Sequence, residues 1–273
     1  MTTILAFDFM RRGLLAALLV GLAAPSIGTF LVQRRLSLTG DGIGHVAFTG
    51  VGLGVLLRTS PVLTAVVVSV IGAVVIEIVR ERAQASGDVA LALLFYGGLA
   101  GGSILIRLAG GTNAALGGYL FGSLSSVSDS DLLVIVTLSL VVICTIALFL
   151  RELFAVCQDL DVARVSGLPV RFLNLLVAVG AAVTVTVAMR TVGLLLVSAL
   201  MVVPVATVQL LARSFRGTLY GACVLGAVMS VGGLVLSYYA DVPPGGSIVM
   251  LSLAAFLVAA VARHFREANL GGA

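Results

Sequence analysis

Hydrophobic residues occur in long runs along this chain, separated by short polar or glycine-rich connections. A helix that crosses a bilayer needs about twenty apolar residues, and somewhat fewer where neighbouring helices enclose it. The runs predict nine helices, at residues 13–33, 43–57, 61–79, 89–108, 131–150, 172–189, 193–212, 217–239 and 246–263. Eight crossings remain if the second run is not a full crossing. We therefore predict an all-α polytopic membrane protein with eight to nine transmembrane helices in a single domain, residues 1–273.

Composition supports this class and excludes others. Hydrophobic residues make up 60% of the chain and charged residues 10%, whereas soluble domains carry roughly 25% charged residues. The net charge is +4, but the arginines are scattered between apolar runs, so we expect no nucleic-acid partner. The chain contains no lysine, and a P-loop requires one. A nucleotide-binding site of the Walker A type is thus excluded from this chain.

The distribution of arginine predicts the orientation, because positively charged loops stay on the cytoplasmic side of a membrane. With nine crossings and the N-terminus outside, the inner connections collect most of the arginines: Arg34, Arg35, Arg80, Arg82, Arg151, Arg164, Arg171, Arg213, Arg216, Arg263 and Arg266. The outer side then holds Arg11, Arg12, Arg58, Arg107 and Arg190. We predict an outer N-terminus and a cytoplasmic C-terminus.

Two connections are longer than turns. The outer one, residues 109–131, contains "GGYLFGSL" and predicts a short interfacial helix. The inner one, "RELFAVCQDLDVARVSGLPVRF", carries apolar residues at helical spacing and many charges: Leu153, Val156, Leu160, Ala163 and either Val165 or Leu168. Gly167 is placed as a C-cap, and Pro169 prevents continuation. The pattern predicts a short amphipathic helix on the cytoplasmic surface; a solvated loop is the alternative.

Polar residues within the apolar runs are the candidates for chemistry, because charged groups are costly inside a bilayer. Asp41 and His45 are four residues apart and share one helical face, with Thr49 one turn further. A carboxylate and an imidazole suit first-row ions such as zinc or manganese. The alternative is that Asp41 caps a helix starting at Gly42 while His45 bonds to a neighbouring span.

Glu77 and a set of glycines complete the candidates. Glu77 is a second residue of the expected pathway, although an interfacial ion pair with Arg80 would explain it without function. Six glycines leave the helix around Asp41 thin: Gly40, Gly42, Gly44, Gly50, Gly52 and Gly54. A thin helix that carries polar residues is expected in the middle of a bundle.

Three blocks together resemble the membrane subunits of metal-ion ABC importers, the zinc/manganese/iron permease family. These blocks are "RRLSLTGDGIGHVAFTGVGLG", "DLDVARVSGLPV" and "VGLLLVSALMVVPVATVQLLA". The resemblance implies a type II-like ABC importer permease fold in a bacterial plasma membrane. It also implies a homodimer of permease subunits, a cytoplasmic ABC ATPase dimer and an extracytoplasmic metal-binding protein.

The resemblance also implies roles for particular residues. Asp41 and His45 would contact the metal during passage, with zinc expected first and manganese next. The segment of about 152–170 would hold the coupling helix that docks on the ATPase, with Asp159, Asp161, Ala163, Arg164 and Gly167 as its contact residues. ATP hydrolysis would occur in the separate ATPase subunit, with no permanently bound cofactor in this chain.

Two other classes compete with this hypothesis. A stand-alone secondary cation transporter, driven by an ion gradient, would normally place several carboxylates at mid-membrane, where this chain offers Asp41 and, less well, Glu77. An intramembrane protease would need an HExxH motif or a pair of intramembrane aspartates, and neither is present.

Overall fold

The computed structural model describes residues 7–82, 87–123 and 128–270, which form twelve α-helices and no strand. The helices are α1 (Asp8–Gln33), α2 (Thr39–Leu56), α3 (Pro61–Arg82), α4 (Gly87–Leu108), α5 (Asn113–Phe121), α6 (Asp129–Leu148), α7 (Leu150–Gln158), α8 (Leu160–Val165), α9 (Val170–Met189), α10 (Leu194–Gln209), α11 (Phe215–Ala240) and α12 (Pro244–Leu270).

Each of the nine predicted hydrophobic runs forms a helix. Within the described residues, seven helices are long and apolar enough to cross a membrane: α1, α3, α4, α6, α9, α11 and α12. Helix α10 is apolar but has only 16 residues. Helix α2 has 18 residues, contains Asp41 and His45, and is not among the seven. The predicted all-α membrane class is confirmed, with α10 and α2 as the eighth and ninth elements.

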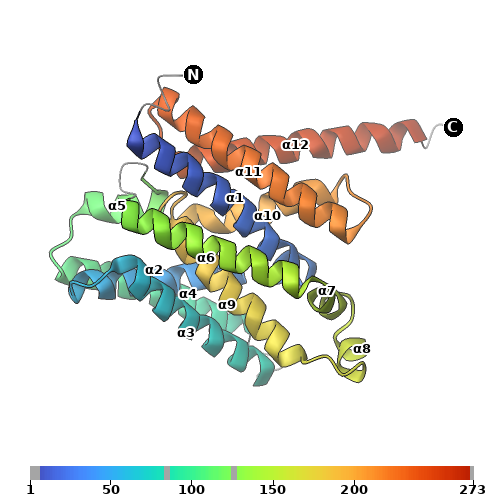
Figure 1. The fold of residues 1–273 in the computed structure, drawn as a ribbon, viewed down its shortest axis with the longest axis horizontal. Coiled ribbons are helices and arrows are strands. Elements are labelled where there is room, and N and C mark those ends of the chain that lie inside the picture. Colours follow the sequence, from blue (N-terminus) through green and yellow to red (C-terminus); the bar gives the residue numbers. More distant parts are fainter. Residues whose placement is uncertain (1–6, 83–86, 124–127, 271–273) are drawn as a thin grey trace.

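The short helices lie at opposite ends of the bundle. In Figure 1, α5 lies toward the left, whereas α7, α8 and the end of α12 lie toward the right. The short helix predicted in residues 109–131 is therefore present as α5. Near it, Arg190 pairs with Asp131 at 3.1 Å, whereas Arg171 pairs with Glu81 at 3.1 Å where α9 begins and α3 ends. Arg190 and Arg171 thus lie at opposite ends of α9, which agrees with their predicted places on opposite sides of the membrane.

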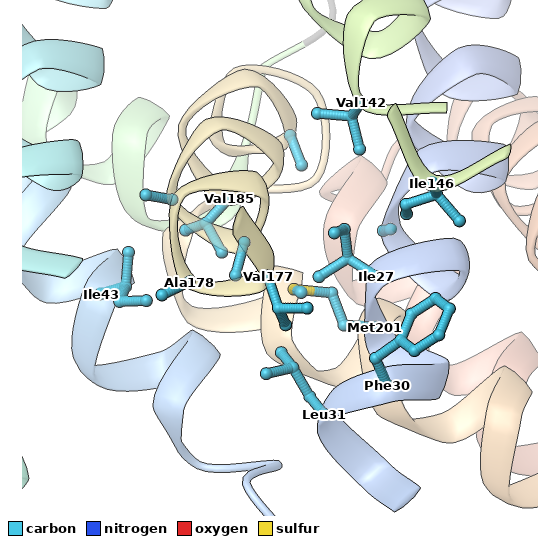
Figure 2. Close-up of a cluster of buried hydrophobic side chains, with 14 of the residues drawn as sticks. Ile27, Phe30, Leu31, Ile43, Val142, Ile146, Val177, Ala178, Val185 and Met201 are labelled. Atoms are coloured by element: carbon cyan, nitrogen blue, oxygen red, sulfur yellow. The ribbon is translucent and has the colours of Figure 1, made fainter. Parts of the chain in front are cut away.

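Buried apolar side chains from α1, α6, α9 and α10 form the main core. Figure 2 shows Ile27 and Phe30 of α1 beside Val177 of α9 and Met201 of α10. Ile43 of α2 reaches the same core from the other side of α9. The core therefore holds α2 against α9, and it fixes the position of the helix that carries the polar candidates.

Helix α2 lies in the interior, as its glycines predict. It contacts α3, α4, α9 and α10, and thirteen of its eighteen residues are buried. Helix α4 approaches closely because Gly98 has no side chain: a Cβ there would lie 2.5 Å from the carbonyl group of His45. Protein rather than lipid therefore surrounds most of α2.

Replacing Gly98 by alanine should destabilise the protein by about 1–3 kcal/mol, the usual effect of overpacking. The matched change Gly97→Ala places its Cβ where no atom lies within 4 Å, and alanine favours a helix over glycine by ~1 kcal/mol. Melting temperatures of the two purified variants in detergent would check the contact. We expect G98A to melt below the parent protein and G97A at or above it; equal melting of both variants would contradict this packing of α4 on α2.

Candidate functional site

Asp41 lies in the first turn of α2 and faces α10. The helix begins at Thr39 with Leu38 as its N-cap, so the alternative in which Asp41 caps a helix starting at Gly42 is wrong. The hydroxyl of Ser198 on α10 donates a hydrogen bond to Oδ1 of Asp41 at 3.2 Å. The positive end of the α2 dipole favours a carboxylate at this position. Asp41 is therefore partly buried in the helical bundle, and the Ser198 hydroxyl binds one of its carboxylate oxygens.

His45 lies one turn further along α2 and is only 1% exposed. Its Nδ1 is buried and has no hydrogen-bond partner among the described residues. The imidazole packs against Phe95 of α4, with 3.9 Å between the ring centroids. An unsatisfied buried polar atom costs about 1–3 kcal/mol. The alternative in which a neighbouring span satisfies this nitrogen is therefore not what the structure shows, and a ligand would remove the cost.

The other two expected pathway residues have partners of their own. The hydroxyl of Thr49 donates a hydrogen bond to the carbonyl oxygen of Gly98 at 2.8 Å. The carboxylate of Glu77 pairs with Arg80 at 2.7 Å, as the ion-pair alternative requires. No cluster of three or more His, Cys, Asp or Glu side chains suited to a metal occurs within the described residues. Asp41 and His45 therefore stand as a pair, without Glu77.

The pair has the chemistry of an incomplete transition-metal site. One carboxylate oxygen and one imidazole nitrogen are common ligands of first-row metals, whereas a structural zinc site normally has four protein ligands. A site with two protein ligands leaves the remaining positions to water or to other groups. Such a site can bind a metal ion briefly and then release it.

A polar hollow of about 530 Å³ lies between the last residues of α1 and α3, the first turns of α9 and the α7–α8 segment. Arg34, Glu77, Arg80 and Cys157 are among its lining residues. Burial raises the pKa of the Cys157 thiol to about 11, although the nearby Arg34 guanidinium acts in the opposite direction. The thiol is consequently protonated at neutral pH. Because metals bind the thiolate, Cys157 is a poor metal ligand here.

The segment at about 152–170 is helical, but it forms two helices and not one. Helix α7 ends at Gln158, and Asp159 has an extended backbone between α7 and α8. The Asp159 carboxylate accepts hydrogen bonds from the backbone N–H groups of Asp161 and Val162, at 2.8 and 3.0 Å. Asp159 is therefore the N-cap of α8. The apolar spacing continues across this break, which explains why one helix was predicted.

Helix α8 ends at Val165 with Ser166 as its C-cap, and the predicted Gly167 follows one residue later. Gly167 has a φ of +78°. Its N–H group donates a hydrogen bond to the carbonyl oxygen of Arg164 at 3.0 Å. The N–H group of Leu168 donates one to the carbonyl oxygen of Ala163 at 3.1 Å. These two bonds form a Schellman motif, which favours glycine at this position. Ala163 is buried and Leu168 packs on the core. Leu168, and not Val165, therefore continues the buried face.

The opposite face of α8 is open. Val165 is 91% exposed and Val162 is 62% exposed. Asp161 and Arg164 form an exposed ion pair at 3.2 Å beside them. Asp159 and Gly167 thus shape the ends of a short helix whose outer face carries apolar and charged groups together, as a docking surface does.

Two residues near the candidate pair were not singled out from the sequence. Ser198 binds Asp41, and the Phe95 ring packs at a tilt against the His45 ring. Ser198 carries a hydroxyl group within a long apolar run, and this isolated polar side chain is a signal that could have identified it. Phe95 carries no comparable signal, because an aromatic residue in an apolar run is ordinary.

A model of the family described as "ABC 3 transport family" matches residues 6–263. The manganese transport system membrane protein MntC of Halalkalibacterium halodurans is 32% identical over 256 residues, which cover 94% of this chain and 88% of the relative. The high-affinity zinc uptake system membrane protein ZnuB of Haemophilus influenzae is 27% identical over 258 residues, covering 94% and 99%.

A solved structure shares the fold. The structure of PsaBC from Streptococcus pneumoniae in complex with Fab aligns with a TM-score of 0.85 and 30% sequence identity. The alignment covers 93% of this chain and 91% of the matched chain. The helical arrangement described above is thus also found in a solved protein of this type.

Proposed function

We propose that this chain, which belongs to the ABC 3 transport family and is a multi-pass permease subunit of the bacterial plasma membrane, carries a divalent transition metal into the cytoplasm. In this proposal the metal passes Asp41 and His45. The observation that carries this proposal is the buried His45 ring, which lies one turn from Asp41 and whose Nδ1 has no hydrogen-bond partner in the part of the chain that the structure describes. In this proposal residues 1–273 act as one domain, with the coupling segment at about 152–170.

The chemistry of the pair supports zinc or manganese as the cargo. One oxygen and one nitrogen ligand suit both ions. The names of two relatives support the same pair, because one is a manganese system and the other a zinc system. Competition between radiolabelled zinc and manganese in the same uptake assay would rank them for this chain.

The energy for transport comes from a separate ATPase subunit in this family, and the absence of lysine from this chain agrees with that division. We infer an assembly of two permease subunits, two ATPases and an extracytoplasmic metal-binding protein. In this assembly the open face of α8 would dock on the ATPase, while Ala163 and Leu168 anchor α8 to the permease core. Movement of the segment would then reach α9, because only four residues, 166–169, connect α8 to α9.

Passage would follow alternating access around α2. The metal would exchange part of its water shell for the Asp41 carboxylate and the His45 imidazole, then leave toward the opposite side. Two protein ligands favour release, since a closed four-ligand site holds zinc tightly. The contact between Ser198 and Asp41 would let movement of α10 change the position of the carboxylate.

Substituting Asp41→Asn or His45→Gln should lower metal uptake by roughly tenfold or more, the effect of removing a charge-assisted ligand worth about 1.5–3 kcal/mol. Uptake would be measured in liposomes that contain the permease with its ATPase. His264→Gln and Asp8→Asn are matched controls, because both residues are exposed. Uptake at the parent level in D41N and H45Q would overturn the assignment of the pair, and uptake by the permease without any ATPase would overturn the importer class.

Substituting Val165→Asp should reduce co-purification of the ATPase by roughly tenfold, since burying a charge in place of a central apolar contact costs about 2 kcal/mol or more. Val242→Asp is the control, because Val242 is also exposed but lies in the connection between α11 and α12. The amount of ATPase retained on the affinity-tagged permease gives the result. If V165D retains as much ATPase as V242D does, the open face of α8 is not the docking surface.

A further inference from the structure

The hydroxyl of Ser198 on α10 donates its hydrogen bond to another helix. Serine and threonine within a helix commonly donate to the carbonyl oxygen one turn earlier in the same helix. Ser103, Thr207 and Ser252 do so here, at 2.8, 2.7 and 2.8 Å. The Ser198 hydroxyl instead reaches Oδ1 of Asp41 on α2, at 3.2 Å. Ser198 therefore acts on the candidate pair, and not on the backbone of its own helix.

The packing of α10 on α2 fixes the place of this hydrogen bond. Leu194 precedes Ser198 by about one turn, and a Cβ on Gly44 would lie 3.0 Å from its Cδ1. Met201 follows Ser198 by about one turn, and a Cβ on Gly40 would lie 3.4 Å from its Sδ. Leu194 and Met201 are both buried. Two close contacts thus flank the hydrogen bond and restrain the separation of the two helices there.

A hydrogen bond to one oxygen changes how a carboxylate binds a metal ion. The bonded oxygen offers less electron density, and the bond restrains rotation of the carboxylate group, so a metal binds mainly through the other oxygen. Zinc prefers a total of four ligands and accepts a single carboxylate oxygen. Manganese suits octahedral sites rich in oxygen, where a carboxylate can supply both of its oxygens, as it does to calcium. Restriction to one oxygen therefore favours zinc.

We propose that Ser198 is a positioning residue that limits Asp41 to one metal-binding oxygen and thereby favours zinc over manganese in transport. This inference rests on the proposed passage of the metal past Asp41. It adds a side chain that touches the carboxylate and not the metal. Without the hydroxyl, both oxygens of Asp41 can turn toward manganese, which then binds more tightly and leaves more slowly.

Uptake of zinc and of manganese by liposomes that contain the permease with its ATPase tests the proposal. The variants are S198A and the pair S198T and S198V, whose side chains have similar volume but differ in the hydroxyl. We expect S198A and S198V to shift the zinc-to-manganese uptake ratio toward manganese by about fivefold, the factor that corresponds to one hydrogen bond of ~1 kcal/mol. S198T keeps the hydroxyl and should keep the parent ratio.

A second readout separates this role from a merely structural one. In S198A, the KM and the maximal rate for manganese should both fall, because tighter binding slows release. Ser103→Ala is the matched control, since Ser103 is also half-buried but donates to the Leu99 carbonyl of its own helix. Melting temperatures in detergent show whether each variant is folded, and S198T against S198V gives the answer if S198A is not.

Three results would overturn the proposal. The first is a zinc-to-manganese ratio that stays at the parent value, or moves toward zinc, in S198A and S198V. The second is an equal shift in S198T and S198V, which would assign the effect to side-chain volume. The third is a parallel loss of both metals with a lowered melting temperature, which would leave Ser198 a structural role alone.

The D41N variant in the same assay separates this inference from the proposed function. Uptake by D41N at the parent level would remove Asp41 from the pathway, and the role of Ser198 with it. If D41N is inactive while the folded Ser198 variants keep the parent ratio, the pathway assignment stands and only the role of Ser198 fails.

Discussion

The burial of α2 is the constraint on which the rest of this structure depends. Lipid cannot solvate a carboxylate or an imidazole, so a helix with Asp41 and His45 must be enclosed by other helices. The enclosure comes from α3, α4, α9 and α10. Glycine makes the enclosure close, since Gly98 lets α4 meet the backbone of His45 directly. The span-length helices then present their apolar outer faces to the bilayer.

The same arrangement connects distant parts of the chain to the candidate pair. Helix α10 touches Asp41 through Ser198 and ends at Gln209, more than two turns further along. Helix α9 packs against α2 and begins directly after the α8 segment. A displacement at that end of the bundle therefore has two short routes to α2, one through α9 and one through α10. Helices that connect two surfaces in this way suit alternating access, in which movement at one end changes exposure at a central site.

Much of the fold followed from the sequence because apolar length is a strong signal in a membrane protein. The nine runs, the interior place of α2 and the glycine end of α8 were all predictable from spacing and glycine content. The start of α2 at Thr39 and the break at Asp159 were not, because both depend on which hydrogen bonds the folded backbone makes. The contacts of Asp41 with Ser198 and of His45 with Phe95 join separate helices. Sequence periodicity describes one helix at a time and carries no information on such pairs.

The central claim is that a metal in transit is bound by His45 beside Asp41. X-ray absorption spectroscopy at the edge of the transported metal, on the metal-loaded transporter in lipid, tests it most directly. The account predicts oxygen and nitrogen ligands that include one imidazole. The imidazole scattering should disappear in H45Q and persist in H264Q. A metal shell without imidazole, or an imidazole signal that survives H45Q, would contradict the account.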